Sequence, residues 1–385
     1  MTTLAPEVRT LSVSIIERAE EMASLETIWR RLQERCPGLT VFSTWEWCST
    51  VARHYATAVP LWLITVWDGG EPVGLAPLAL RNRNGLRTLV LLGTGLLDYP
   101  MADYQDFLAV DGHEEQVVKA VCGALHRRQS EWDLLWLQEL PTFSRLRESL
   151  PNAARDFGWR VVLEPGSETY SLGLPASWDA FKTILSPNTR GALERKTRKL
   201  ERDKDARFHR ITEADELEEA MEALFRLHVQ RWRAVGKPGI FRTPRRRAFD
   251  RELAAAFLES GMLDLTLVTT SEGVAGARYS FEYQGVTYFY ASGFLPGDEW
   301  SRYSLGFVMD GHSIRRAIEA GLYREDFLRG DGEYKRRYGV QEYHNVGLLA
   351  AHRIRPLVQY ETFRGMRTLA KKTLGPLKRR LRSWS

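Results

Sequence analysis

Cysteine is scarce in this chain of 385 residues, which holds only Cys36, Cys48 and Cys122. The three are odd in number, widely spaced and confined to the first third of the chain. No two of them have the Cys-x-x-Cys spacing of a metal or redox site. The sequence therefore argues against a disulfide framework and predicts a reducing compartment, so we expect the protein in the cytoplasm.

Long apolar runs are also lacking. No stretch approaches the roughly 18 residues that a helix needs to span a bilayer. The first 22 residues contain no basic segment followed by an apolar one, which is the arrangement of a secretory signal. We therefore expect a chain that is neither exported by such a signal nor inserted across a membrane.

Several catalytic motifs have no counterpart in the sequence. The eight histidines are scattered, and there is no His-Glu-x-x-His, no acidic run with calcium-loop spacing, no P-loop and no Gly-x-Ser-x-Gly elbow. These absences argue against the common zinc hydrolases, EF-hand proteins, P-loop nucleotide hydrolases and serine hydrolases. We expect an activity that uses no metal.

Acidic residues nearly disappear at the C-terminal end. Residues 351–385 hold ten Lys and Arg and one acid, Glu361, a net charge of +9, whereas the whole chain carries +5. The remainder is thus −4, so the positive charge describes a tail rather than the body. Within 356–385, Leu and Phe are interleaved with basic residues, which predicts peripheral contact with anionic lipid at the inner face of the membrane. The alternative is a disordered solubilising tail, because Gly375-Pro376 interrupts any long helix.

The composition that remains is ordinary for a globular protein, 44% hydrophobic and 27% charged, and the length suits about two domains. In the first half, β-rich runs at 61–67 and 72–80 flank the turn 68–71, Asp-Gly-Gly-Glu, which is strong hairpin chemistry. In the second half, helices lead to three successive strands, a helix and another strand. The strands expected there are 263–270, 274–283, 286–292 and 324–328, and the helix is 305–320.

This order of elements predicts a mixed α/β (α+β) fold with two tandem lobes, each a mostly antiparallel mixed sheet flanked by helices. The stretch 164–175, which contains Pro, Gly and Ser, marks the crossing between the lobes. The expected domains are 1–165, 166–355 and a basic tail, 356–385.

Two segments are candidates for chemistry. Residues 286–307 run from a strand through a loop of Gly, Pro and Ser into a helix, and the N–H groups at such a helix start suit a pyrophosphate. The alternative is an ordinary turn with an N-cap. Residues 321–339 are dense in Asp, Glu, Tyr and Lys, which supply general acids, bases and hydrogen-bond donors. The alternative there is a loop in which Asp326 caps or pairs with Lys335 or Arg336.

The second half of the chain resembles a known family. The pattern Tyr-x-Tyr-x-x-Gly-Phe … Ser-x-Gly … Gly-x-x-x-x-Asp-Phe-x-x-Gly-x-x-x-Tyr-Lys-x-x-Tyr-Gly, from Tyr288 to Gly339, resembles the CelD-type GNAT acyltransferases associated with cellulose and exopolysaccharide synthesis. These enzymes are relatives of the FemABX aminoacyltransferases. Supporting pieces are Phe42–Trp47, the helix 186–200 and His228-x-x-Arg231-Trp232.

The resemblance implies two GNAT-like lobes and an acyltransferase. Such an enzyme moves an acyl group from acetyl-CoA or another acyl-CoA to a small-molecule amine, for example an amino sugar or amino acid, in polysaccharide or envelope metabolism. Two alternatives stay open: a FemABX-like transferase that uses aminoacyl-tRNA, and a catalytically idle GNAT scaffold for a membrane-bound synthase. One departure concerns the donor. GNAT enzymes usually carry Arg/Gln-x-x-Gly-x-Gly/Ala, but here, aligned on Gly306, Ser301 and Ser304 occupy the first two signature positions.

The same comparison suggests which residues act. For each single tyrosine among them, packing in the core of the sheet is the alternative. We expect a catalytic set, a donor-binding set and an acceptor-binding set: Glu282, Tyr290, Asp326 and Tyr334; Arg302, Ser304, Leu305 and Gly306; His228, Arg231, Tyr288 and Lys335.

The helix expected at 188–203 is rich in basic residues. Arg195, Lys196, Arg198 and Lys199 fall within about one turn, and such a face grips phosphates of a nucleotide sugar, of CoA or of tRNA. The alternative is a solvated face with pairs such as Glu194–Arg198.

Overall fold

The structure is a computed structural model that describes residues 11–56, 59–94, 102–330 and 332–366. The last part of the predicted basic tail, 367–385, lies outside the described residues. Among the residues that are described, no helix is both long enough and apolar enough to cross a membrane.

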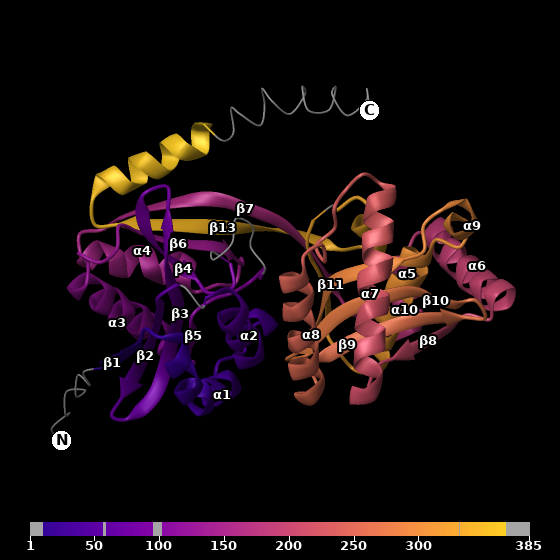
Figure 1. The fold of residues 1–385 in the computed structure, drawn as a ribbon, viewed down its shortest axis with the longest axis horizontal. Coiled ribbons are helices and arrows are strands. Elements are labelled where there is room, and N and C mark those ends of the chain that lie inside the picture. Colours follow the sequence, from indigo (N-terminus) through magenta and orange to yellow (C-terminus); the bar gives the residue numbers. More distant parts are fainter. Residues whose placement is uncertain (1–10, 57–58, 95–101, 331, 367–385) are drawn as a thin grey trace, which may run out of the picture. The chain divides into compact units, whose positions relative to one another are not determined.

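The chain divides into two compact units (Figure 1). Unit 1 contains Met1–Pro37, Tyr55–Gly166 and Val346–Ser385, and unit 2 contains Gly38–His54 and Ser167–Asn345. The change-over at 166/167 lies close to the boundary expected from the sequence. Two segments fall in the other unit from the one that their place in the sequence suggested, because residues 38–54 pack with unit 2 and residues 346–355 with unit 1.

Unit 1 is a mixed sheet with helices. Strands β4 and β6 are parallel, whereas the β1–β2, β2–β3 and β3–β4 pairs are antiparallel. The strand order is β1 (Ser12–Ile16), β2 (Leu61–Asp68), β3 (Glu71–Arg83), β4 (Leu86–Leu91), β6 (Leu134–Leu140) and β13 (Gln341–Ala351), with β5 (Leu108–Ala109) paired to β3. The α-helices are α1 (Glu26–Arg35), α3 (Glu114–Arg127) and α4 (Leu146–Asp156).

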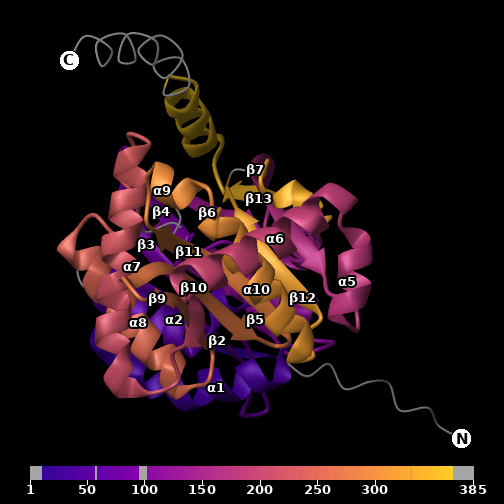
Figure 2. The ribbon, with the colours of Figure 1, turned by 90° about the vertical axis from the view of Figure 1, so that its right-hand side faces the viewer.

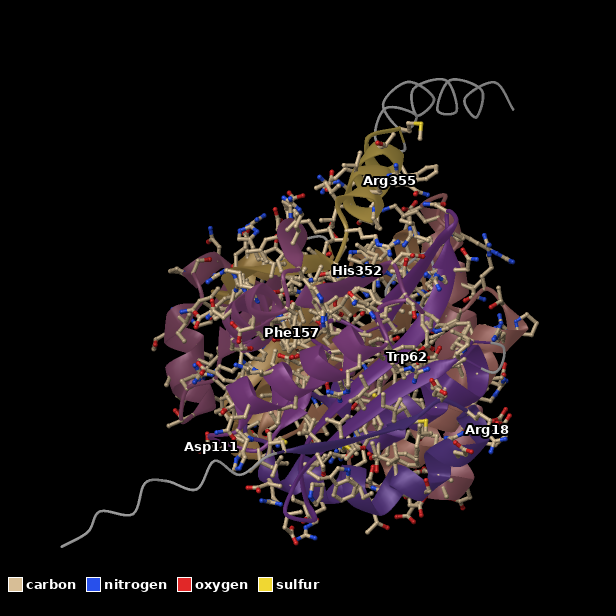
Figure 3. The ribbon with its side chains drawn as sticks, turned by 90° about the vertical axis from the view of Figure 1, so that its left-hand side faces the viewer. Arg18, Trp62, Asp111, Phe157, His352 and Arg355 are labelled. Carbon is tan, nitrogen blue, oxygen red and sulfur yellow. The ribbon has the colours of Figure 1, made fainter. Side chains whose placement is uncertain are left out.

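The predicted hairpin of unit 1 forms between β2 and β3. Gly69 and Gly70 at its turn have φ angles of 55° and 94°, the left-handed values that a tight hairpin turn requires and that glycine adopts without a steric penalty. Trp62 of β2 is buried in the core of unit 1, and Phe157 packs against that core (Figure 3). Most residues of β2 and β3 are buried consecutively, so these strands are covered on both faces.

The strands of unit 2 also combine parallel and antiparallel pairing. Strands β11 and β12 are parallel, and the other pairs, β7–β12, β11–β10, β10–β9 and β9–β8, are antiparallel. The strand order is β7 (Arg160–Gly173), β12 (Arg324–Arg329), β11 (Val286–Phe294), β10 (Gly273–Tyr283), β9 (Leu263–Thr270) and β8 (Arg207–Arg210). The predicted mixed α/β class, with three successive strands, a helix and a fourth strand, is confirmed.

Helices cover both faces of the unit 2 sheet (Figure 2). Alternate side chains of β10 show the two faces, since the Phe281 ring contacts Phe257 on α8, whereas Arg278 contacts Asp310 on α10. The helices are α2 (Trp45–Tyr55), α5 (Trp178–Ile184), α6 (Pro187–Lys204), α7 (Ala214–Ala234), α8 (Pro244–Glu259), α9 (Asp298–Ser301) and α10 (Leu305–Glu319).

The parallel strands β11 and β12 separate after a short stretch of pairing. They pair only from Val286 to Tyr288 and from Arg324 to Asp326, although both strands continue. On its other edge, β11 contains a bulge, because Tyr279 faces Ala291 while the next residue of β10 faces Phe289. A bulge bends and twists its strand. We call the resulting gap between the two strands the fork.

Helix α7 approaches β11 very closely at one glycine. A Cβ atom on Gly293 would fall well inside contact distance of the backbone nitrogen of His228. The φ angle of Gly293 is not in the left-handed region, so space rather than backbone conformation requires glycine here. The helix and the strand that border the fork are thus held backbone to backbone.

We expect Gly293→Ala to destabilise the protein by about 3 kcal/mol or more, because neither backbone can yield without losing core packing. Gly173→Ala on β7 is the matched control, since no atom lies within 4 Å of its added Cβ. Urea unfolding followed by circular dichroism measures both. A free energy of unfolding for Gly293→Ala within about 0.5 kcal/mol of wild type would contradict this close approach.

Candidate functional site

A pocket of about 340 Å³ lies at the fork in unit 2. Its walls come from β11, from the loop 295–304, from the start of α10 and from the segment after β12. The lining residues are Arg231, Phe289, Ser292, Phe294, Leu295, Pro296, Gly297, Trp300, Ser301, Ser304, Leu305, Gly306, Phe307, Asp310, Tyr334, Arg337 and Tyr338. The lining is thus largely apolar, with a few polar and charged groups, as expected for a small-molecule site.

The first turn of α10 contributes backbone donors to this pocket. Ser304 precedes the helix with φ 54° and ψ 53°, a left-handed conformation that is uncommon for a residue with a side chain. Its side chain does not cap the helix, and the N–H groups of Leu305 and Gly306 have no hydrogen-bond partner among the described residues. A helix start of this kind attracts anions through its N–H groups and its dipole.

Arg231 supplies a cation to the pocket wall. This residue of α7 donates from Nη1 to the Ser292 hydroxyl at 3.1 Å, and its guanidinium lies 4.2 Å from the centre of the Phe294 ring. Burial lowers the pKa of Arg231, but a guanidinium in a protein stays charged.

Asp310 supplies an anion. Its side chain is 5% exposed, its Oδ2 accepts a hydrogen bond of 3.1 Å from the Tyr338 hydroxyl, and its Oδ1 lies 3.5 Å from Nε of Arg278. Burial raises the pKa of Asp310, and the charge of Arg278 opposes that rise. The orientation of the Asp310 carboxylate is therefore fixed by one contact at each of its oxygens.

Beneath Asp310 a buried charge network continues between the sheet and α10. Arg278 also pairs with Glu325 on β12, which is fully buried. Deeper in the unit, Arg316 pairs with Asp264 at 3.0 Å and with Glu282. Burial raises the pKa of Glu325 to about 7, although Arg278 lowers it.

The raised pKa of Glu325 predicts a pH-dependent contribution to stability. Its ordinary pKa is 4.5, so between about pH 4.5 and 7 the folded protein holds a proton that the unfolded chain has released. The free energy of unfolding therefore falls as the pH rises through this window. Glu325→Gln removes the titrating group. Relative to wild type, we therefore expect the free energy of unfolding of the variant to rise by about 1 kcal/mol for each pH unit within this window. Denaturant unfolding at pH 5 and pH 8 measures the difference, and an equal difference at both pH values would contradict the assignment.

Five of the twelve residues predicted from the sequence line the pocket: Arg231, Ser304, Leu305, Gly306 and Tyr334. Arg302 does not line it. Its carbonyl accepts a hydrogen bond from the ammonium of Lys196, a residue of the basic helix α6. In the same region, the ammonium of Lys199 lies 5.8 Å from the centre of the Tyr303 ring. Two of the four basic residues that the sequence analysis singled out on this helix therefore reach the segment before α10.

The remaining predicted acids and Lys335 lie outside the pocket. Glu282 is held by Arg316 and Arg210 within the charge network. The Asp326 Oδ1 accepts the N–H of Leu328 at 2.8 Å, and the Lys335 ammonium donates to the carbonyls of Phe327, Leu328 and Arg329. Asp326 and Lys335 thus stabilise the chain at the end of β12. They do not pair with each other in any contact that the structure gives.

Tyr288 and Tyr290 point into an aromatic core that includes residues of the segment 38–54. Tyr288 is 1% exposed and lies 5.8 Å from the Phe42 ring, and burial raises its pKa. The Tyr290 hydroxyl accepts a hydrogen bond of 2.7 Å from Arg246, and its ring packs at 5.7 Å from Trp47. Core packing, the alternative given for the tyrosines, describes both positions.

His228 is locked by two backbone groups. The N–H of Ile240 donates to its Nε2 at 3.1 Å, so Nδ1 carries the proton and donates to the Ser292 carbonyl at 2.8 Å. Burial lowers the pKa of His228 to about 4. The ring is therefore neutral, has both nitrogens occupied and orients α7 against β11.

Sequence reasoning missed Asp310, Tyr338, Arg337 and Ser292, which also line the pocket. One signal was present: Asp310 is a charged residue at i, i+4 and i+7 spacing with the apolar Ile314 and Ala317 of α10. A buried charge at such a position implies a buried partner.

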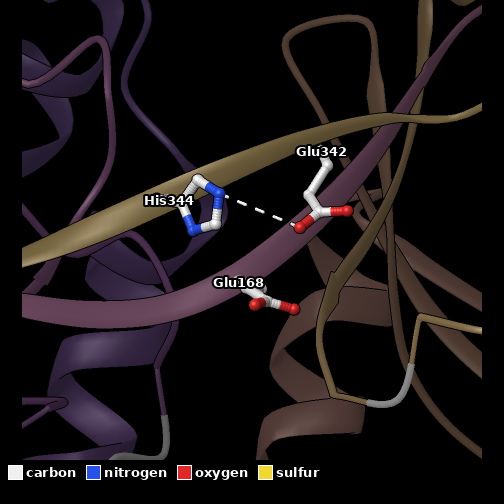
Figure 4. Close-up of side chains that lie close together, drawn as sticks. All are labelled: Glu168, Glu342 and His344. Atoms are coloured by element: carbon white, nitrogen blue, oxygen red, sulfur yellow. Dashed lines mark ion pairs between the residues drawn. The ribbon is translucent and has the colours of Figure 1, made fainter.

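One exposed group among the described residues has metal-ligand geometry. Glu168, Glu342 and His344 bring their ligand atoms within 4.8 Å of one another (Figure 4). Glu342 also pairs with Arg336 at 2.8 Å, and Glu168 accepts a hydrogen bond from Tyr170. Exposed acidic groups with such protein partners need no ion, so we assign no site here.

Comparison with known proteins places this geometry in a class. Residues 187–336 match the family model described as "Acetyltransferase (GNAT) domain". No curated protein shows significant similarity to the chain. The matched range contains the loop before α10, most of the charge network and nearly the whole pocket.

Solved structures show the same fold over most of the chain. A crystal structure of FemX has a TM-score of 0.62 and 12% identity, covering 87% of this chain and 98% of that one. L-PGS from Bacillus licheniformis has a TM-score of 0.53 and 12% identity, covering 88% and 96%. The C-terminal domain of a putative lysylphosphatidylglycerol synthetase from Agrobacterium fabrum has a TM-score of 0.52 and 10% identity, covering 90% and 96%.

The sequence match and the fold agree on the class of protein. The match to the GNAT acetyltransferase domain lies within unit 2, and GNAT domains generally take their acyl group from acyl-CoA. The protein is an acyltransferase, as the sequence predicted.

Proposed function

We propose that the pocket of unit 2 binds an acyl-CoA and transfers its acyl group to a small-molecule amine. One observation supports this most: the pocket lies where β11 and β12 separate, and the first turn of α10 lines it. A thioester with a phosphate-bearing tail suits such a site, because its anionic part meets the N–H groups of the helix start.

The conformation of Ser304 supports CoA as the donor despite the altered signature. Ser304 stands where acetyl-CoA enzymes of the GNAT type usually carry glycine, and its φ is 54°. Glycine adopts this left-handed conformation without steric cost. The loop therefore keeps the backbone shape that the signature glycine provides, at some cost in strain.

In the proposed reaction, the amine nitrogen attacks the thioester carbonyl carbon, the carbon–sulfur bond breaks and the thiolate leaves. Positioning of the two reactants and polarisation of the carbonyl by N–H donors lower the barrier. Asp310, Tyr334 and Tyr338 are the pocket groups that accept or supply protons. An amino sugar or amino acid of polysaccharide or envelope metabolism is the proposed acceptor class.

A thermal-shift titration with coenzyme A and acetyl-CoA tests the donor. We expect an increase in Tm with both ligands, corresponding to about 2.7 kcal/mol at a hundredfold excess over Kd. Ser304→Glu should abolish the shift, because it places a negative charge beside the proposed phosphate seat. Ser304→Gln, of equal size and no charge, is the matched control and should keep most of it.

Absence of any shift in the wild-type protein would contradict an acyl-CoA donor. The same titration with aminoacyl-tRNA at two salt concentrations would then test the FemABX-like alternative, since phosphate contacts weaken steeply with salt. An equal loss of the Tm shift in both Ser304 variants would show that the size of the side chain, rather than its charge, disrupts ligand binding.

We also propose that the C-terminal helix binds an anionic membrane surface. The helix includes residues 354–366, and Ile354, Val358 and Met366 on it are 50%, 57% and 52% exposed. A spacing of four places Ile354 and Val358 on one side of the helix, and Met366 lies about 80° further round the helix axis than Val358. The basic residues of 367–385 follow directly in the sequence. An apolar stripe next to basic residues is the pattern of interfacial helices.

Sedimentation with lipid vesicles tests this contact. We expect the protein to bind vesicles with about 30% phosphatidylserine and not vesicles of phosphatidylcholine alone, since each basic residue near the surface contributes about 1 kcal/mol. Ile354→Ser with Val358→Ser should reduce binding severalfold, and removal of 367–385 should abolish it. Equal binding to both kinds of vesicle would contradict an electrostatic contact.

A further inference from the structure

Three charged residues line the pocket of unit 2, the cations Arg231 and Arg337 and the anion Asp310, and Arg231 forms no ion pair with Asp310. Arg231 and Asp310 each influence the pKa of the other, so they lie within electrostatic range. Among the ion pairs of the described residues, none joins the two groups within 4.0 Å.

The guanidinium of Arg231 contacts only neutral groups among the described residues. Arg231 donates to the Ser292 hydroxyl and stacks on the Phe294 and Trp232 rings. Among the described residues, no carboxylate lies within ion-pair distance of its guanidinium. Most of its five N–H donors therefore have no protein acceptor, and their planar arrangement matches a carboxylate that binds through both oxygens.

Asp310 shares its protein counter-ion with a second carboxyl group. Arg278 is the guanidinium that faces both Asp310 and Glu325, so one cation serves two carboxylates. Glu325 takes the closer contact, and Asp310 keeps the longer one of 3.5 Å. A buried carboxylate with so weak a counter-charge is stabilised by another cation.

We propose that the acceptor is a zwitterion, an α-amino acid or a related amino-carboxylate. Its carboxylate binds Arg231, and its ammonium group binds Asp310. Phe289, Phe294 and Phe307 in the lining favour an apolar side chain on this acceptor. The inference rests on the proposed function and names the substrate class for the same site.

The bound pose also defines a proton path. The ammonium N–H bond breaks and its proton passes to the Asp310 carboxylate, which leaves a neutral amine. The nitrogen lone pair attacks the thioester carbon, the carbon–sulfur bond breaks with its electrons going to sulfur, and the second nitrogen proton ends on the thiolate. Tyr338 and Arg278, which hold the two oxygens of Asp310, are positioning residues.

Three related compounds separate the two charges of the acceptor: L-phenylalanine, L-phenylalaninamide and N-acetyl-L-phenylalanine. With the full-length protein saturated with CoA, we expect phenylalanine to bind at least about tenfold more tightly than either analogue by thermal shift, since a hydrogen bond to a charged group contributes about 1.5–3 kcal/mol. Transfer from acetyl-CoA to phenylalanine and to its amide is followed by thiol release.

Arg231→Gln should remove the preference for phenylalanine over its amide while the Tm shift with CoA persists. Arg231→Lys should restore part of that preference. Arg233→Gln on the same helix, an exposed residue outside the pocket, is the matched control. If Arg231→Gln instead abolishes the CoA shift and leaves the preference unchanged, Arg231 serves the donor and the inference is wrong.

Asp310→Asn should lower kcat at least about a hundredfold and remove the preference for phenylalanine over its N-acetyl derivative. Tyr338→Phe is the milder second variant and should lower kcat several-fold without loss of CoA binding. Unchanged turnover in either a folded Asp310→Asn or a folded Tyr338→Phe protein would overturn the proton path.

Different results would contradict the proposed function and the proposed zwitterionic acceptor. A wild-type protein that shows no shift with CoA would contradict the proposed function itself. A wild-type protein that binds CoA but does not distinguish the three compounds, or binds none of them, would overturn the zwitterion alone.

Discussion

The early end of pairing between β11 and β12 is the constraint on which the site depends. Parallel strands that stayed paired would leave no gap, but these two separate after Tyr288 and Asp326. The bulge in β11 bends one strand, and the contacts of Asp326 and Lys335 with the chain after β12 hold the other side. Asp326 and Lys335, which the sequence analysis assigned to the catalytic and acceptor-binding sets, therefore hold the backbone that shapes the pocket. Ligands in open α/β sheets bind where strands diverge in this way.

Burial of charge beside that gap is costly, and the arrangement limits the cost. Arg278 and Arg316 each contact two carboxylates, so the network beneath the pocket needs few cations. Removing one partner of such a network leaves an uncompensated buried charge. The charged residues that line the pocket, Arg231, Asp310 and Arg337, differ from the rest of the network because a ligand can reach them. Asp310 belongs both to the charge network and to the pocket lining. The charge of a bound ligand therefore acts on the network through Asp310.

The fold was predictable from the sequence because its signals are local and periodic. The turn at Gly69 and Gly70 and the meander that ends at β11 follow from turn chemistry and from β-rich runs of residues. The site was predictable only in part. The backbone donors at Ser304 to Gly306 form a contiguous loop, which a sequence pattern reveals. Glu282 and Asp326 were indistinguishable from Asp310 in sequence, because only packing decides which carboxylate meets a cation inside and which lines a pocket.

The sequence His228-x-x-Arg231 shows how one motif divides two tasks. A spacing of three places both side chains on the same side of α7. His228 uses both ring nitrogens on backbone groups, and Gly293 lets the helix approach β11 without a side chain between them. That close approach brings Arg231, one turn later, to the Ser292 hydroxyl and the pocket wall. A histidine with a depressed pKa is therefore the support for a permanently charged arginine, and the ligand meets only the arginine.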